Sequence, residues 1–208
     1  MCLPEATPQT PRPRIQGLSD LIFGLALSVA AISFTFGGSL PSDPVILTND
    51  LASFGFTFLI LINVWNRYTS TTSVMPIETP VMVRVNMLLL FLVAIEPLLF
   101  NVLYLRGFST EVGQEASVYY GLDIGGMNLI LAYFTHLLTV EEKKLVPKEM
   151  IRRLKFTRNL LLFAAALFFV SDLPIFSSLV FAGFPVRIDI WVISIPIVFL
   201  PRILSSRF

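Results

Sequence analysis

The chain has 208 residues, of which 55% are hydrophobic and only 14% are charged, with a mean hydropathy of +0.78. Soluble domains carry about 25% charged residues, so the composition excludes an ordinary soluble protein and indicates an integral membrane protein. A formal net charge of +1 gives no electrostatic reason to expect a nucleic-acid partner, and a single cysteine excludes both an intrachain disulfide and a multi-cysteine metal site.

Apolar stretches long enough to cross a membrane follow one another along the chain, since a helical span needs about 20 residues. They cover residues 18–36, 51–65, 85–105, 116–140, 154–175 and 188–204. The sequence therefore predicts an all-α integral membrane protein with six transmembrane helices. Residues 1–13 are rich in proline and are expected to form a disordered tail, which leaves residues 14–208 as one transmembrane domain.

Basic residues predict the orientation of these spans. Of the 15 lysines and arginines, only Arg106 and Arg187 fall on the side opposite the termini, and the other thirteen lie in the tails and the alternate loops. This bias predicts that both termini are cytoplasmic. Arg12 and Arg14 before an apolar stretch also fit a signal peptide, but Asp20 and the prolines downstream favour a retained span.

Three polar residues stand at the start of the first span, namely Arg14, Ser19 and Asp20. Ionisable groups inside a membrane are costly unless they face protein or water, so they often mark functional positions. A simpler interpretation makes Arg14 a cytoplasmic anchor and Ser19 or Asp20 a helix N-cap.

An apolar stripe runs along the same helix. Leu25, Val29 and Ile32 are spaced so that they share one helical face, and Ser28 lies beside them. Such a stripe can face lipid or pack in a core. Around a symmetry axis it would instead form rings that close a pore by dewetting. The spacing alone does not choose between these.

Residues 14–20 (Arg-Ile-Gln-Gly-Leu-Ser-Asp) resemble the Arg-x-x-x-Phe-Ser-Asp opening of the endosomal and lysosomal potassium channel family (transmembrane protein 175) and its prokaryotic relatives. The resemblance continues at Trp65 in the second span. It extends to the asparagine and leucine run of residues 85–91 and to Pro97 in the third. The match covers residues 14–105, and the later spans agree in number and length.

The resemblance implies a potassium-permeable cation channel in a prokaryotic cell membrane, formed by a homotetramer whose first helix lines a central pore. Leu25, Val29 and Ile32 would then form the gate, and Ser28 would line the pore. Potassium would be a permeant ion, with no resident cofactor or metal. The chain has no Thr-Val-Gly-Tyr-Gly filter. The partners implied are other copies of the chain, the lipid bilayer and potassium ions.

The resemblance also implies a structural polar network that joins Arg14, Ser19 and Asp20 to Trp65. The family's paired histidines after the tryptophan are missing, so the residues that follow Trp65, at positions 66–68 (Asn-Arg-Tyr), are the candidates to replace them. Two other departures are Leu18, in place of the motif's phenylalanine, and the small Val29, which would widen the constriction.

A proton-coupled transporter of small solutes is the alternative, because Glu96 lies in the middle of the third span and could carry a proton. Asp123, Asn128 and Asp172 are further intramembrane polar candidates. No internal repeat of the kind common in transporters is visible. The lone His136 is interpreted as an interface residue. The sequence also lacks the motifs of an intramembrane enzyme, so no catalytic activity is expected.

Overall fold

The computed structural model describes residues 14–33, 43–73, 79–108, 110–140, 147–181 and 184–194. Its elements are α1 (Arg14–Ser33), α2 (Pro44–Thr72), α3 (Pro80–Arg106), α4 (Glu111–Thr139), α5 (Lys148–Ser171), α6 (Pro174–Ser178), β1 (Val180–Phe181) and β2 (Phe184–Pro185). Residues 186–194, which follow β2 directly, are also helical. The expected tail, residues 1–13, lies outside the described residues.

The long helices match the predicted spans but differ from them at the ends. α2 extends beyond the predicted 51–65 in both directions, and α5 ends at Ser171 rather than at residue 175. Pro174 explains the second difference, because proline lacks the N–H that would continue a helix but suits the first position of a new one. Pro174 accordingly begins α6. Residues 34–36 and 195–204, at the ends of two predicted spans, lie outside the described residues.

Side-chain caps fix where several helices begin. The Asp43 carboxylate accepts a hydrogen bond from the backbone N–H of Val45 at 2.9 Å, and Thr110 Oγ1 accepts one from Gly113 at 3.1 Å. Each bond satisfies an N–H that the first helical turn leaves free. After α6, β1 and β2 pair antiparallel in a hairpin with two residues in each strand. The sequence analysis did not predict this element.

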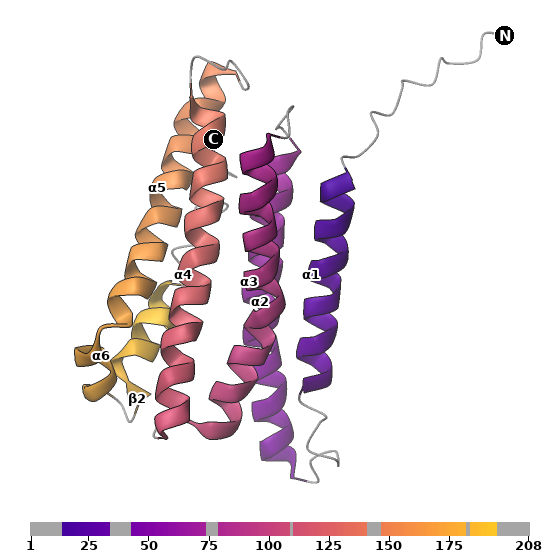
Figure 1. Ribbon diagram of the computed structural model, residues 1–208. Helices are drawn as coiled ribbons and strands as arrows, with labels where there is room; N and C mark the ends of the chain where they lie inside the picture. Colours follow the sequence, from indigo (N-terminus) through magenta and orange to yellow (C-terminus); the bar gives the residue numbers. More distant parts are fainter. Residues whose placement is uncertain are drawn as a thin grey trace, which may run out of the picture.

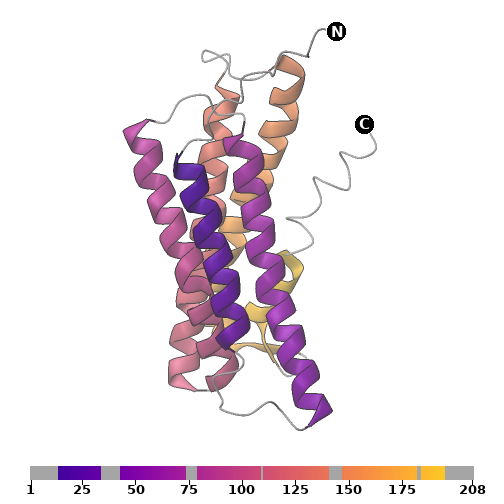
Figure 2. The same cartoon turned by 90° about the vertical axis from the view of Figure 1, so that its right-hand side faces the viewer.

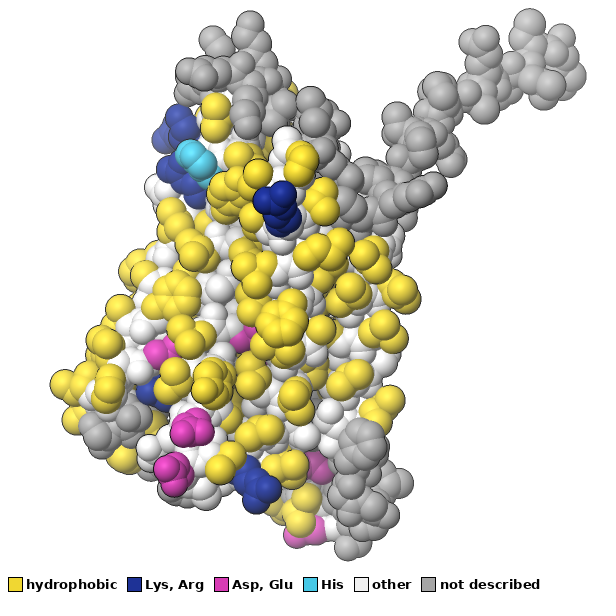
Figure 3. Space-filling model, in the orientation of Figure 1, with side chains coloured by type: hydrophobic (Ala, Val, Ile, Leu, Met, Phe, Trp, Pro, Cys, Tyr) yellow, Lys and Arg dark blue, Asp and Glu magenta, His cyan; other side chains and the backbone are white. Residues whose placement is uncertain are grey.

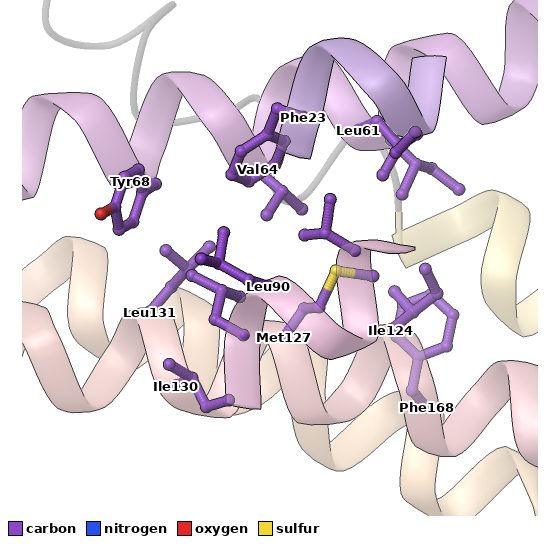
Figure 4. Close-up of a cluster of buried hydrophobic side chains, with 14 of the residues drawn as sticks. Phe23, Leu61, Val64, Tyr68, Leu90, Ile124, Met127, Ile130, Leu131 and Phe168 are labelled. Carbon is purple, nitrogen blue, oxygen red and sulfur yellow. The ribbon is translucent and has the colours of Figure 1, made fainter. Parts of the chain in front are cut away.

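The helices form one bundle, with α1 at one edge and α5 and α6 at the other (Figure 1). α1 packs against α2 and α3 and lies in front of and between them in Figure 2. Each of the five long helices sends a buried side chain into one continuous core. Figure 4 labels Phe23, Leu61, Leu90, Met127 and Phe168 as examples from α1 to α5 in order.

Four described segments are long and apolar enough to cross a membrane: Gln16–Ser33, α2, α3 and Met150–Ser171. Hydrophobic side chains cover the middle of the face seen in Figure 3, whereas basic side chains and a histidine gather at its upper end. Together with the composition, these segments make the chain a multi-pass integral membrane protein.

α4 is not among these four segments, and its position in the bundle explains why. It packs between α3 and α5 and also contacts α2. Asp123, Asn128 and Thr135 are therefore buried against protein. A helix surrounded by other helices does not have to be apolar on every side. Average hydropathy therefore underestimates how well such a helix suits a membrane span.

Glycines allow α5 to approach α4 closely. A methyl group added at Gly121 would overlap the Asp172 carboxylate, and one at Gly125 would lie 2.6 Å from Cε1 of Phe169. The two glycines are four residues apart and so share one face of α4. This is the small-xxx-small pattern of tightly packed membrane helices.

Candidate functional site

α1 has two contrasting faces. On one face, Leu25, Val29 and Ile32 are 55%, 47% and 51% exposed in the single chain. The opposite face packs into the bundle through Ser19, Phe23, Ala26 and Ala30, all at most 3% exposed. The stripe identified from the sequence is therefore the face of α1 that the described part of the subunit leaves uncovered.

Small and polar residues accompany the stripe on this exposed face. Ser28 is exposed and its hydroxyl donates to the backbone oxygen of Gly24 at 2.9 Å, an ordinary bond within the helix. Gly17 and Gly24 have open space where a side chain would be, with nothing within 4 Å. Another helix could approach this face closely.

Ser19 is the centre of a buried hydrogen-bonded cluster that joins three helices. Its hydroxyl lies 2.8 Å from the hydroxyl of Tyr68 on α2 and accepts a bond of 3.2 Å from Nδ2 of Asn86 on α3. Ser19 is completely buried, and Tyr68 and Asn86 are nearly so. Since unsatisfied buried polar groups are costly, these bonds favour one rotation of α1 about its axis.

The neighbouring residue makes a second link to α2. Nε1 of Trp65 donates to Oδ1 of Asp20 at 2.9 Å. The structure thus brings together three of the four residues expected in the polar network, and the side chain of the fourth, Arg14, lies outside the described part. Tyr68, one of the three candidates at positions 66–68, contacts the network through Ser19. Sequence reasoning did not assign Asn86 to the network, although an amide in an apolar helix was a usable signal.

A different buried polar group lies between α3 and α4. The Tyr120 hydroxyl donates to Oε1 of Glu96 at 3.3 Å, and the charge of Asp123 acts on both residues. Glu96 and Tyr120 are fully buried and Asp123 is 2% exposed. Within the described chain, Glu96 Oε2 and both carboxylate oxygens of Asp123 have no hydrogen-bond partner.

Arg187 forms a third polar cluster, which ties the helical residues 186–194 to α4 and α5. Its Nε donates to the Ser171 backbone oxygen at 2.8 Å, and its Nη atoms bond to Ser117 and to the Asp172 backbone oxygen. Trp191 donates to Oγ of Ser171 at 2.8 Å. The sequence analysis took Arg187 only as one of two basic residues on the outer side, and its buried role was missed.

The remaining polar candidates do not join these clusters. His136 is exposed and its Nδ1 lies 3.2 Å from Nη1 of Arg158, whereas Asn128 bonds back to the Ile124 carbonyl of its own helix. Among the described residues, no group of three or more His, Cys, Asp or Glu side chains could hold a metal ion.

Comparisons with known proteins identify the fold. No protein-family model and no curated protein match the chain. The crystal structure of a lysosomal potassium-selective channel TMEM175 homolog from Chamaesiphon minutus is similar, with a TM-score of 0.57 and 17% identity. The alignment covers 93% of this chain and 96% of that one.

A variant of the potassium channel MtTMEM175, crystallised with a nanobody–MBP fusion, has a TM-score of 0.63 and 16% identity, over 100% of this chain and 99% of that one. These matches extend over nearly the whole chain, beyond the residues 14–105 that carry the sequence resemblance. The chain therefore has the fold of the bacterial TMEM175 potassium channel homologues.

Proposed function

We propose that this protein is a potassium-permeable cation channel of a prokaryotic cell membrane, formed by four copies of the chain around a central pore lined by α1. The observation that carries the proposal is the exposed stripe of Leu25, Val29 and Ile32 on a helix whose other face is fixed in the bundle. Both solved structures of the same fold are described as potassium channels, which supports this use of the helix.

The stripe would form the gate. Four copies of each side chain around an axis make three apolar rings, and narrow apolar rings hold back water and ions until they widen. Ser28 lies among them on the exposed face and would provide a hydroxyl to the pore. Selectivity would then depend on this constriction, since the sequence has no Thr-Val-Gly-Tyr-Gly filter. The pore needs no resident cofactor.

The polar residues at the start of α1 would hold the pore helix in place. The bonds from Ser19 to Tyr68 and from Asp20 to Trp65 support this role, because both lead from α1 to α2. Arg14, at the first position of α1, would complete the network on the cytoplasmic side. The role assigned to these residues is structural, without direct contact to the ion.

The membrane topology in this proposal has six spans and cytoplasmic termini. α1 to α5 would be five of them, and the helix that begins at residue 186 would be the sixth. The basic side chains at the upper end in Figure 3 support a cytoplasmic location for that end.

Ion flux through purified protein in liposomes tests the proposal. We expect passive flux that is greater for potassium than for sodium when pH is clamped equal on both sides, and unchanged when a pH gradient is imposed. Native mass spectrometry of the same preparation should give the mass of four 23.3 kDa chains.

Absence of potassium flux under the pH clamp, together with proton-driven uptake of a solute, would contradict the channel. That result would favour the transporter alternative built on Glu96. A monomeric or dimeric mass would separately reject a four-fold pore around α1.

A further inference from the structure

The buried acids between α3 and α4 have no part in the proposed pore. Glu96 lies on α3 directly before Pro97, and Asp123 lies on α4. α1 instead packs against α2 and α3 and presents Leu25 and its neighbours outward. Tyr120, whose hydroxyl bonds to Glu96, lies three residues before Asp123 on α4, so the two acids belong to the same part of the contact between α3 and α4.

The hydrogen bonding of the two acids is incomplete. Of their four carboxyl oxygens, only Oε1 of Glu96 has a partner within the described chain, the Tyr120 hydroxyl. Asp123 is 2% exposed, and neither of its carboxylate oxygens has a hydrogen-bond partner among the described residues. Buried carboxylates are normally hydrogen-bonded or paired with a cation. Two ionised carboxylates buried in this helix contact without such partners would be strongly unfavourable.

Neighbouring charges do not compensate the pair. The groups that act on the charge of Glu96 are Asp123 and Tyr120, neither of which is basic. α5 and residues 186–194 contribute Asp172 and Arg187, whose charges act on each other. On the other side, Asp20 on α1 bonds to Trp65, and Asp50 on α2 accepts a bond from Tyr104. Asp20 and Asp50 therefore have partners of their own, whereas both carboxylate oxygens of Asp172 have no hydrogen-bond partner within the described chain.

A proton satisfies this site better than a metal ion does. Calcium and magnesium take six or more oxygen ligands, often including waters, and the described residues provide no third acid or histidine to form a metal group here. A proton on one carboxyl removes one charge and converts an acceptor into an O–H donor. It thereby fills part of the hydrogen bonding that the pair lacks.

We propose that Glu96 and Asp123, with Tyr120 donating to Glu96, form a proton-binding site inside each subunit that is separate from the α1 pore. One of the two carboxyls holds the bound proton, and the Tyr120–Glu96 bond links α3 to α4 beside Pro97. Loss of the proton leaves two buried negative charges between these helices and weakens their contact. This inference does not depend on ion conduction, because it concerns the interior of a single subunit.

Infrared spectroscopy of the purified protein, at about pH 7, tests the site directly. We expect the C=O stretch of a protonated carboxyl group in the native protein. The Glu96→Gln/Asp123→Asn double variant should lose it, because its amides have the same shape but do not ionise. Glu115→Gln is the matched control: it makes the same chemical change on an exposed position of α4 and should keep the band.

The pH dependence of stability is a second measurement, and the native protein alone already gives an informative result. If the folded protein holds a proton that the unfolded chain releases, stability falls as pH rises. The native protein and Glu115→Gln should therefore unfold at a lower temperature at about pH 9 than at about pH 6, and the double variant should lose most of this shift.

Absence of a protonated carboxyl band in the native protein would overturn the proposal and indicate that a cation neutralises the pair. Retention of the band in the double variant would also overturn it, because another group would then hold the proton. If the double variant fails to fold, the native protein decides the matter, since an unfolding temperature that does not fall with rising pH contradicts the site.

Discussion

Trp65 on α2 donates its indole N–H to Asp20 on α1, with 2.9 Å between Nε1 and Oδ1. Asp20 directly follows Ser19, whose hydroxyl contacts Tyr68 one turn further along α2. Two successive residues of α1 are thus bonded to two positions on a single neighbouring helix. This arrangement fixes the rotation of α1 and, with it, the direction of the exposed apolar stripe.

Replacing Trp65 with phenylalanine should weaken this anchor. A hydrogen bond to a charged group contributes about 1.5–3 kcal/mol, so we expect Trp65→Phe to lower the free energy of unfolding by that amount. It should also raise basal potassium flux, because α1 gains freedom to rotate. Chemical unfolding in detergent and liposome flux measure the two effects.

Trp191→Phe is the matched control, since Trp191 also donates one indole bond but to Ser171, far from α1 in the sequence. It should lose stability without a change in basal flux. If folded Trp65→Phe and the native protein gave equal potassium flux, Trp65 would not be part of the anchor that holds α1.

Shortening the stripe should open the proposed gate. Leu25→Ala widens one apolar ring in all subunits at once, and we expect basal potassium flux to rise on the order of tenfold, which corresponds to about 1.4 kcal/mol off the barrier. Leu88→Ala on α3 is the control, because Leu88 is 52% exposed against 55% for Leu25. Unchanged potassium flux in a folded Leu25→Ala tetramer would show that Leu25 is not part of the gate.

The contact between α4 and α5 should not tolerate a larger residue at Gly125. Gly125→Ala places a methyl group 2.6 Å from Cε1 of Phe169, and we expect it to lower the free energy of unfolding by about 1–3 kcal/mol. Gly55→Ala is the control, because nothing lies within 4 Å of the added group. Alanine favours helix over glycine by up to about 1 kcal/mol. A neutral Gly125→Ala would show that the helices separate easily.

Arg187 should be essential to the stability of the end of the bundle that holds α6. Arg187→Met removes its bonds to Ser171, Asp172 and Ser117, so we expect a loss of about 3 kcal/mol or more in unfolding free energy. Arg106→Met changes an exposed arginine and should stay within about 0.5 kcal/mol of the native protein. Similar unfolding midpoints for the two variants would contradict the role of Arg187.

Local sequence patterns were enough to predict most of the helices and to place Leu25, Val29 and Ile32 together on one face of α1. Composition and run length identify apolar segments, and proline accounts for the end of α5 before Pro174. The spacing of Leu25, Val29 and Ile32 defines one face because helical geometry is regular. Asp20 and Trp65 were also predicted as partners, through a resemblance in which both residues are part of one pattern.

The tertiary structure alone decided which helix is central and which polar residues meet. Glu96 accepts a bond from Tyr120 on the next helix, and Arg187 bonds to Ser117, 70 residues earlier in the chain. In a membrane, lipid-facing and core-facing side chains are both apolar, so hydropathy does not tell which face of a helix packs inward. That choice depends on close packing, as at Gly121 and Gly125, and on the need to satisfy buried polar groups, which only the assembled bundle determines.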